Sequence, residues 1–152
     1  MSISLPGYLE LDLQRDISIE DEAVKSLRGG GTAKVVQGKL LNNAFIQRFG
    51  IVDIALKVFP QESASQDFIY EVAIMNAIPD SPYLCRLVGY YNKTFPAIIA
   101  MKYYPSTMTS LFEDPNYQKT SNIILKAAHD IANGLDLLHD NQIIHFDVKP
   151  GE

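Results

Sequence analysis

Apolar positions along the chain change their spacing several times, and each spacing predicts a different element. Residues 51–59 form a β-rich run that Pro60 ends, which predicts a strand. With residues 24–36 around a glycine cluster, this region is expected to form two or three strands joined by turns. Similar runs at 83–91 and 95–104 are separated by Asn-Lys-Thr, so they predict a hairpin.

Two stretches have helical spacing instead. Residues 63–78 place Phe68, Val72 and Met75 on one face, and prolines follow at once, which predicts a single helix between the strands. Residues 121–139 have the strongest helical pattern of the chain, with Ser121 or Thr120 expected as the cap. The predicted apolar face of this helix consists of Ile124, Ala128, Ile131, Leu135 and Leu138. After it, Ile143-Ile144 is expected to form a short strand.

Composition limits the class of protein. The 152 residues are 47% hydrophobic, enough for a globular core, and the net charge is −5 with scattered Lys and Arg, which argues against a nucleic-acid partner. Cys85 is the single cysteine, so neither an internal disulfide nor a cysteine-rich metal site can form. No apolar stretch approaches the roughly 18 residues that span a bilayer. We therefore expect a cytoplasmic protein without a membrane partner.

Three features within this pattern carry possible chemistry. Gly29, Gly30 and Gly31 would let backbone amides approach a phosphate, although a glycine triplet is more often a flexible turn. Lys57 lies in an otherwise apolar strand, which allows two interpretations. It is either a lysine at the sheet edge that discourages aggregation or a cation that binds the phosphates of a ligand. Glu71 on the following helix either faces water or is the carboxylate partner that Lys57 requires.

The segment 145–150, His-Phe-Asp-Val-Lys-Pro, is the most specific motif in the chain. It resembles the catalytic loop of the protein kinase family, which reads His-Arg-Asp-x-Lys-Pro-x-Asn. The resemblance implies that Asp147 is the catalytic residue that accepts or orients the proton of the substrate hydroxyl, while Lys149 supports the transferred phosphate. Lysine at this position is usual in Ser/Thr kinases, so the resemblance implies that preference.

Earlier stretches resemble further kinase motifs, in the family's order. Residues 27–38 align with the glycine-rich loop, residues 55–57 with the phosphate-contacting strand, and Glu71 with its helix partner. Met101 matches the residue that gates the inner pocket beside the hinge, and residues 131–139 match the helix before the catalytic loop. The resemblance therefore implies an ATP site formed by Leu27, Gly29, Gly30, Gly31, Val35, Ala55, Lys57, Glu71, Met101 and Tyr103.

The resemblance implies an α+β fold with an antiparallel twisted sheet and one helix in a kinase-like N-lobe. We expect a lead-in at 1–22, the N-lobe and hinge at 23–104, and the start of a C-lobe at 105–152. The cofactors implied are ATP and Mg²⁺, and the partners are a protein substrate or a regulatory protein.

Several positions depart from the family pattern. Phe146 replaces the loop arginine, Lys102 replaces the acidic hinge residue, and Arg28 and Ala33 replace two glycines of the glycine-rich loop. Glu152 stands at the metal-binding Asn position and no Asp-Phe-Gly follows, so we expect an incomplete Mg²⁺ site and an inactive 152-residue chain. The alternatives are a catalytically inactive kinase-like binding module and, more remotely, an unrelated α+β domain.

Overall fold

A computed structural model describes residues 3–19, 33–59, 65–94 and 96–149. The chain divides into two compact units, residues 1–79 with 85–103 and residues 80–84 with 104–152, and each unit is described by itself. The first unit contains a sheet with helices, and the second contains two helices and a loop. The predicted α+β fold is confirmed.

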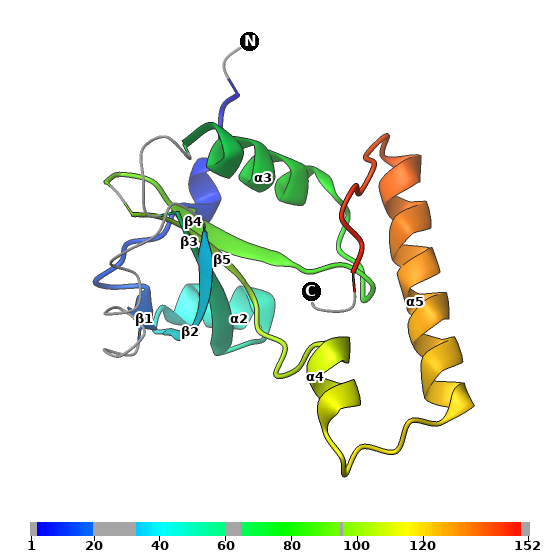
Figure 1. The fold of residues 1–152 in the computed structure, drawn as a ribbon. Helices are drawn as coiled ribbons and strands as arrows, with labels where there is room; N and C mark the ends of the chain where they lie inside the picture. The colour runs from blue at the N-terminus through cyan, green and yellow to red at the C-terminus, as the bar shows by residue number, and fades with distance from the viewer. Residues whose placement is uncertain (1–2, 20–32, 60–64, 95, 150–152) are drawn as a thin grey trace. The chain divides into compact units, whose positions relative to one another are not determined.

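The first unit is organised around a five-stranded antiparallel sheet in the order β1-β2-β3-β5-β4 (Figure 1). Its strands are β1 (Ile17–Ile19), β2 (Lys34–Leu40), β3 (Asp53–Phe59), β4 (Leu87–Tyr91) and β5 (Ala97–Lys102). The predicted strand at 51–59 and the predicted hairpin at 83–104 are present as β3 and as the β4–β5 pair. β1 was not predicted, since its three residues lie in the segment interpreted as a lead-in.

Alternation along β3 separates two apolar cores. Ile54, Leu56 and Val58 are buried on one side of the strand, whereas Phe59 belongs to the core of the other side. The same alternation places the Lys57 side chain on the side opposite Leu56, as the sequence predicted. A charged group can therefore sit in the middle of an apolar strand without entering the core around Leu56.

The helix α3 (Ser65–Ala77) packs on the side of the sheet that carries Phe59 (Figure 1). Phe68 and Val72 are buried and Met75 packs beside them, which confirms the predicted helix and its apolar face. These residues are spaced by four and three positions, so one stripe of the helix faces the sheet. Burial of this stripe fixes the direction in which the neighbouring side chains of α3 project.

A second helix, α2 (Asn43–Phe49), packs on the opposite side of the sheet, and the sequence analysis missed it. The Asn42 side chain accepts a hydrogen bond from the Ala44 amide, and Gly50 ends the helix with a left-handed φ of 68°. Both end signals were readable in the sequence. Two turns are too short for a convincing apolar periodicity, and packing of the partly buried Phe45 and Phe49 against the sheet stabilises the helix instead.

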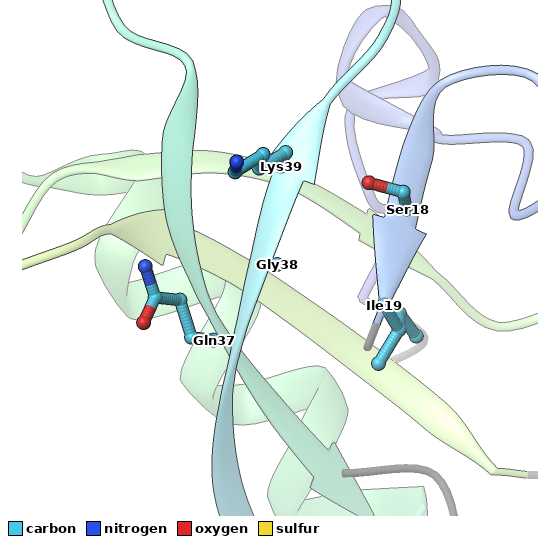
Figure 2. Close-up of a pocket in the computed structure, with 5 residues that line it drawn as sticks. All are labelled: Ser18, Ile19, Gln37, Gly38 and Lys39. Carbon is cyan, nitrogen blue, oxygen red and sulfur yellow. The ribbon is translucent and has the colours of Figure 1, made fainter. Parts of the chain in front are cut away.

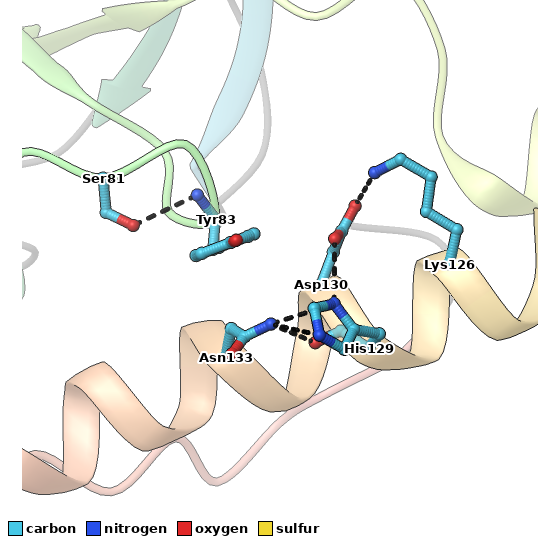
Figure 3. Close-up of polar contacts among 6 residues, drawn as sticks. All are labelled: Ser81, Tyr83, Lys126, His129, Asp130 and Asn133. Atoms are coloured by element: carbon cyan, nitrogen blue, oxygen red, sulfur yellow. Dashed lines mark hydrogen bonds and ion pairs between the residues drawn. The ribbon is translucent and has the colours of Figure 1, made fainter.

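The second unit contains α4 (Met108–Glu113) and α5 (Ser121–Asp140). Thr107 caps α4 with a capping box, and Thr120 caps α5 by accepting from the Ile123 amide, as one of the two predicted caps. Figure 3 shows polar contacts along α5, including the i,i+4 ion pair of Lys126 with Asp130 and the Asn133 amide donating to the His129 carbonyl at 2.9 Å.

The buried face of α5 agrees with the predicted one at Leu138 and differs along the first half of the helix. Among the described residues, only Gly134 and Leu138 of this helix are buried, and Ile124 and Ile131 stay 48% and 46% exposed. Gly134 packs closely against the backbone of Tyr83. A Cβ at position 134 would lie 3.1 Å from the Tyr83 carbonyl oxygen. The predicted short strand at Ile143–Ile144 is wrong: both residues lie in an irregular segment after the helix.

Candidate functional site

The clearest polar contact in the first unit joins β3 to α3. The Lys57 Nζ atom donates to both Oε1 and Oε2 of Glu71, each at 2.7 Å, and both side chains are 30% exposed. Glu71 follows Phe68 by three positions and precedes Val72, so packing of α3 aims its carboxylate toward the sheet. The two residues singled out in the sequence therefore form an ion pair.

The strand register shows which residues share the sheet face with Lys57. Val35 of β2 pairs directly with Lys57, and Ala55 pairs with Met101 of β5. Because directly opposite residues in antiparallel strands project to the same side, Val35, Ala55, Lys57 and Met101 lie on one face. Val35 is 62% exposed there, so an open apolar surface adjoins the ion pair.

Phe59 is a neighbour of the ion pair that sequence reasoning missed. Its ring centroid lies 5.5 Å from the Lys57 Nζ atom, so the ammonium has an aromatic face beside it as well as a carboxylate. The period of two along a strand was the available signal, because Phe59 is two positions beyond Lys57 on β3.

The remaining predicted site residues of the first unit are placed as follows. Leu27, Gly29, Gly30 and Gly31 lie outside the described residues. Tyr103 is half-buried immediately after β5, one residue beyond the end of the strand that carries Met101. The predicted contacts of these residues with a nucleotide stay predictions.

A shallow hollow lies where β1 meets β2. Figure 2 shows its lining, which is Ser18, Ile19, Gln37, Gly38 and Lys39. Gln37 pairs with Ala55 across the strands, so its amide lies on the face that carries Lys57. Among the predicted site residues that the structure describes, none lines this hollow.

The predicted catalytic loop lies in the second unit, after α5. Lys149 Nζ lies 2.6 Å from Asp147 Oδ2, and the Asp147 amide donates to His145 Nδ1 at 3.3 Å. Asp147 is 70% exposed. The hydrogen bond and the charge of Lys149 hold the pKa of the Asp147 carboxyl below its usual value. The structure therefore brings the two predicted catalytic residues together as an ion pair.

Replacing Lys149 by methionine is expected to raise the pKa of Asp147. The folded-state pKa is lowered because Lys149 favours the charged carboxylate, so without the lysine the carboxylate takes up its proton at higher pH. A carbon-detected NMR titration of the Asp147 carboxyl measures this directly. Lys126→Met is the matched control: it should raise the pKa of Asp130, which Lys126 lowers, and leave Asp147 unchanged. An unaltered Asp147 midpoint in Lys149→Met would contradict the assignment.

Metal-binding sites and membrane-spanning helices are two other classes of feature. Within residues 3–19, 33–59, 65–94 and 96–149, no group of three or more His, Cys, Asp or Glu residues is placed to hold a metal ion. Across the same residues, no helix is both long and apolar enough to cross a bilayer.

The sequence of this chain matches a known protein family. The family model of the protein tyrosine and serine/threonine kinases matches residues 22–150, a range that includes strands β2 to β5, the Lys57–Glu71 pair and the loop that carries Asp147 and Lys149. The sheet and helix that the structure shows agree with the fold implied by this match. The chain therefore belongs to the protein tyrosine and serine/threonine kinase family.

Proposed function

We propose that this chain binds ATP and carries the catalytic loop of a protein kinase that transfers the γ-phosphoryl group to serine or threonine hydroxyls of a protein. The observation that supports this most is the Lys57–Glu71 ion pair, which lies beside the exposed Val35 on the face of the sheet that α3 partly covers. A lysine held by a carboxylate next to an exposed apolar surface suits a ligand with a flat base at one end and phosphates at the other.

The residues of this face fit a nucleotide. Val35, Ala55 and Met101 offer apolar contact to the adenine ring, since they lie on the same side of three adjacent strands. The Lys57 ammonium carries three N–H donors, and two of them are directed at Glu71. The third can bind a phosphate oxygen, while Glu71 keeps the ammonium in place.

The catalytic step is assigned to the loop of the second unit. The substrate hydroxyl oxygen forms a bond to the γ-phosphorus, the bond to the bridging oxygen of ADP breaks, and Asp147 accepts the hydroxyl proton. The Asp147 carboxyl, whose pKa lies below its usual value, is charged at neutral pH and can therefore orient the hydroxyl. Lys149 stabilises the negative charge of the transferred group. Mg²⁺, when bound, neutralises charge on the phosphates.

The Ser/Thr preference rests on the resemblance of residues 147–150, Asp-Val-Lys-Pro, to the catalytic loop of Ser/Thr kinases. Tyrosine kinases usually place Ala or Arg near the position of Lys149. In a complete kinase domain that contains this loop, acid hydrolysis of a substrate protein labelled from γ-labelled ATP separates phosphoserine and phosphothreonine from phosphotyrosine. Label found on tyrosine alone would contradict the preference.

Nucleotide binding is tested by thermal unfolding with and without Mg²⁺ and ATP. Ligand at about a hundred times its Kd should stabilise the wild-type chain by about 2.7 kcal/mol, which raises Tm by several degrees. Lys57→Met should abolish the shift, whereas Lys119→Met, at an exposed position of the second unit, should retain it. No shift in the wild type would leave a kinase-like binding module as the function.

A further inference from the structure

The N-terminal segment of the chain packs directly on α3, the helix that carries Glu71. Leu9, in the short 3₁₀ helix η1 (Gly7–Leu9), is buried in the same apolar cluster as Phe68 and Val72 of α3. The Tyr8 hydroxyl donates to the Asn76 Oδ1 atom at 3.2 Å, near the end of α3. Figure 1 shows η1 lying against α3.

The same segment is fastened to the outer edge of the sheet. The Leu11 amide donates to the Tyr90 carbonyl oxygen of β4 at 2.7 Å, and Glu10 forms an isolated parallel bridge with Tyr90. A Glu10–Lys93 ion pair at 3.5 Å adds a contact beyond β4. Pairing along β4, the last strand of the sheet, satisfies an edge that would otherwise be open. Residues 8–11 are therefore a fixed part of the first unit.

Helix α2 also contacts Tyr8, through the side chain of Arg48. The Arg48 guanidinium lies 4.8 Å from the centroid of the Tyr8 ring and 5.2 Å from that of Phe49. Arg86, which directly precedes β4, lies 4.8 Å from the same Phe49 ring. Tyr8 thus contacts α3 through its hydroxyl and α2 through its ring, which links the two helices on opposite sides of the sheet.

We propose that residues 8–11 are a positioning element that holds α3 where Glu71 meets Lys57. The Lys57–Glu71 pair is 30% exposed, and a partly exposed ion pair is too weak to fix a helix of 13 residues by itself. Leu9 and Tyr8 contribute burial and a hydrogen bond on the same helix, so their removal shifts α3 away from the paired position. The expected effect of this segment on nucleotide binding rests on the proposed function.

The first test measures the helix without any ligand. Amide hydrogen exchange of α3 should become roughly three- to tenfold faster in Tyr8→Ala, as loss of one hydrogen bond and one ring contact predicts, while exchange in β3 and β5 stays unchanged. Tyr70→Ala is the matched control, because Tyr70 is a tyrosine on α3 itself whose exposed fraction of 50% is close to the 60% of Tyr8. Wild-type exchange of α3 in Tyr8→Ala, or equal effects of Tyr8→Ala and Tyr70→Ala, would overturn the proposal.

The second test measures the consequence for the site. Tyr8→Ala should weaken Mg²⁺-ATP binding roughly three- to tenfold, because less of the protein has Glu71 paired with Lys57. Tyr8→Phe keeps the ring under Arg48 and should restore part of the affinity, which a general loss of stability would not explain. If the wild type binds no nucleotide, the proposed function fails, and the exchange experiment alone decides whether the segment positions α3. Nucleotide binding that is equal in wild type and Tyr8→Ala would overturn the link to the site.

Discussion

Phe68→Ala is expected to lower the free energy of unfolding of the first unit by about 3–5 kcal/mol. Phe68 is 2% exposed, and its ring meets Phe59 edge-on at 5.6 Å between centroids and Tyr90 at 6.2 Å. Truncation therefore removes buried apolar area and two aromatic contacts, and it leaves a cavity between α3 and the sheet. Since Phe68 lies one helical turn before Glu71, the Lys57–Glu71 pair should also be lost more often.

Urea denaturation followed by far-UV circular dichroism gives the change in free energy of unfolding. Phe146→Ala is the matched control, because the Phe146 side chain is 92% exposed and its truncation should change stability by no more than about 0.5 kcal/mol. Equal denaturation midpoints for the Phe68→Ala and wild-type proteins would mean that α3 is not packed as described.

Gly89→Ala is expected to destabilise the first unit by about 1–3 kcal/mol, the range for overpacking of a close contact. A Cβ at Gly89 would come within 2.8 Å of both the Leu9 carbonyl oxygen and the Leu11 Cγ atom. The backbone oxygen cannot rotate away as a side chain can, so the N-terminal segment must move off β4. Because the same segment contacts α3, we expect faster amide exchange in that helix too.

Gly7→Ala separates this steric effect from the general effect of replacing a glycine. No atom lies within 4 Å of a Cβ placed at Gly7, which is in the same segment, so this variant should be nearly neutral. Urea midpoints of the two variants are compared with that of the wild type. A Gly89→Ala protein as stable as Gly7→Ala would show that the segment does not lie against β4 in solution.

Elements with a long or strongly alternating pattern were predictable. The β3 strand, the α3 helix and the β4–β5 pair follow from runs whose period matches their secondary structure. The ion pair was also predictable, because Lys57 was the one cation in a largely apolar strand and Glu71 lay on the next helix. In both cases the sequence pattern of neighbouring residues predicts the structure, and burial in the tertiary structure stabilises the same arrangement.

Short elements were not predictable, because tertiary contacts stabilise them. β1 has only three residues and exists by pairing with β2, from Ile17–Leu40 to Ile19–Gly38. Helix α2 is stabilised by packing of Phe45 and Phe49 on the sheet. The buried side of α5 also differed from its apolar face, because the neighbouring segment meets the helix at Gly134, where a backbone can approach closely.

The sequence by itself determined the family and the order of the main strands and helices, and it predicted the residues of the candidate site, because motif spacing and apolar period are properties of neighbouring residues. Only the tertiary structure decided that the N-terminal residues 8–11 pack on α3 and β4. These contacts join residues far apart in the chain. Their formation depends on which surfaces bury each other, and a local pattern contains no information on that choice.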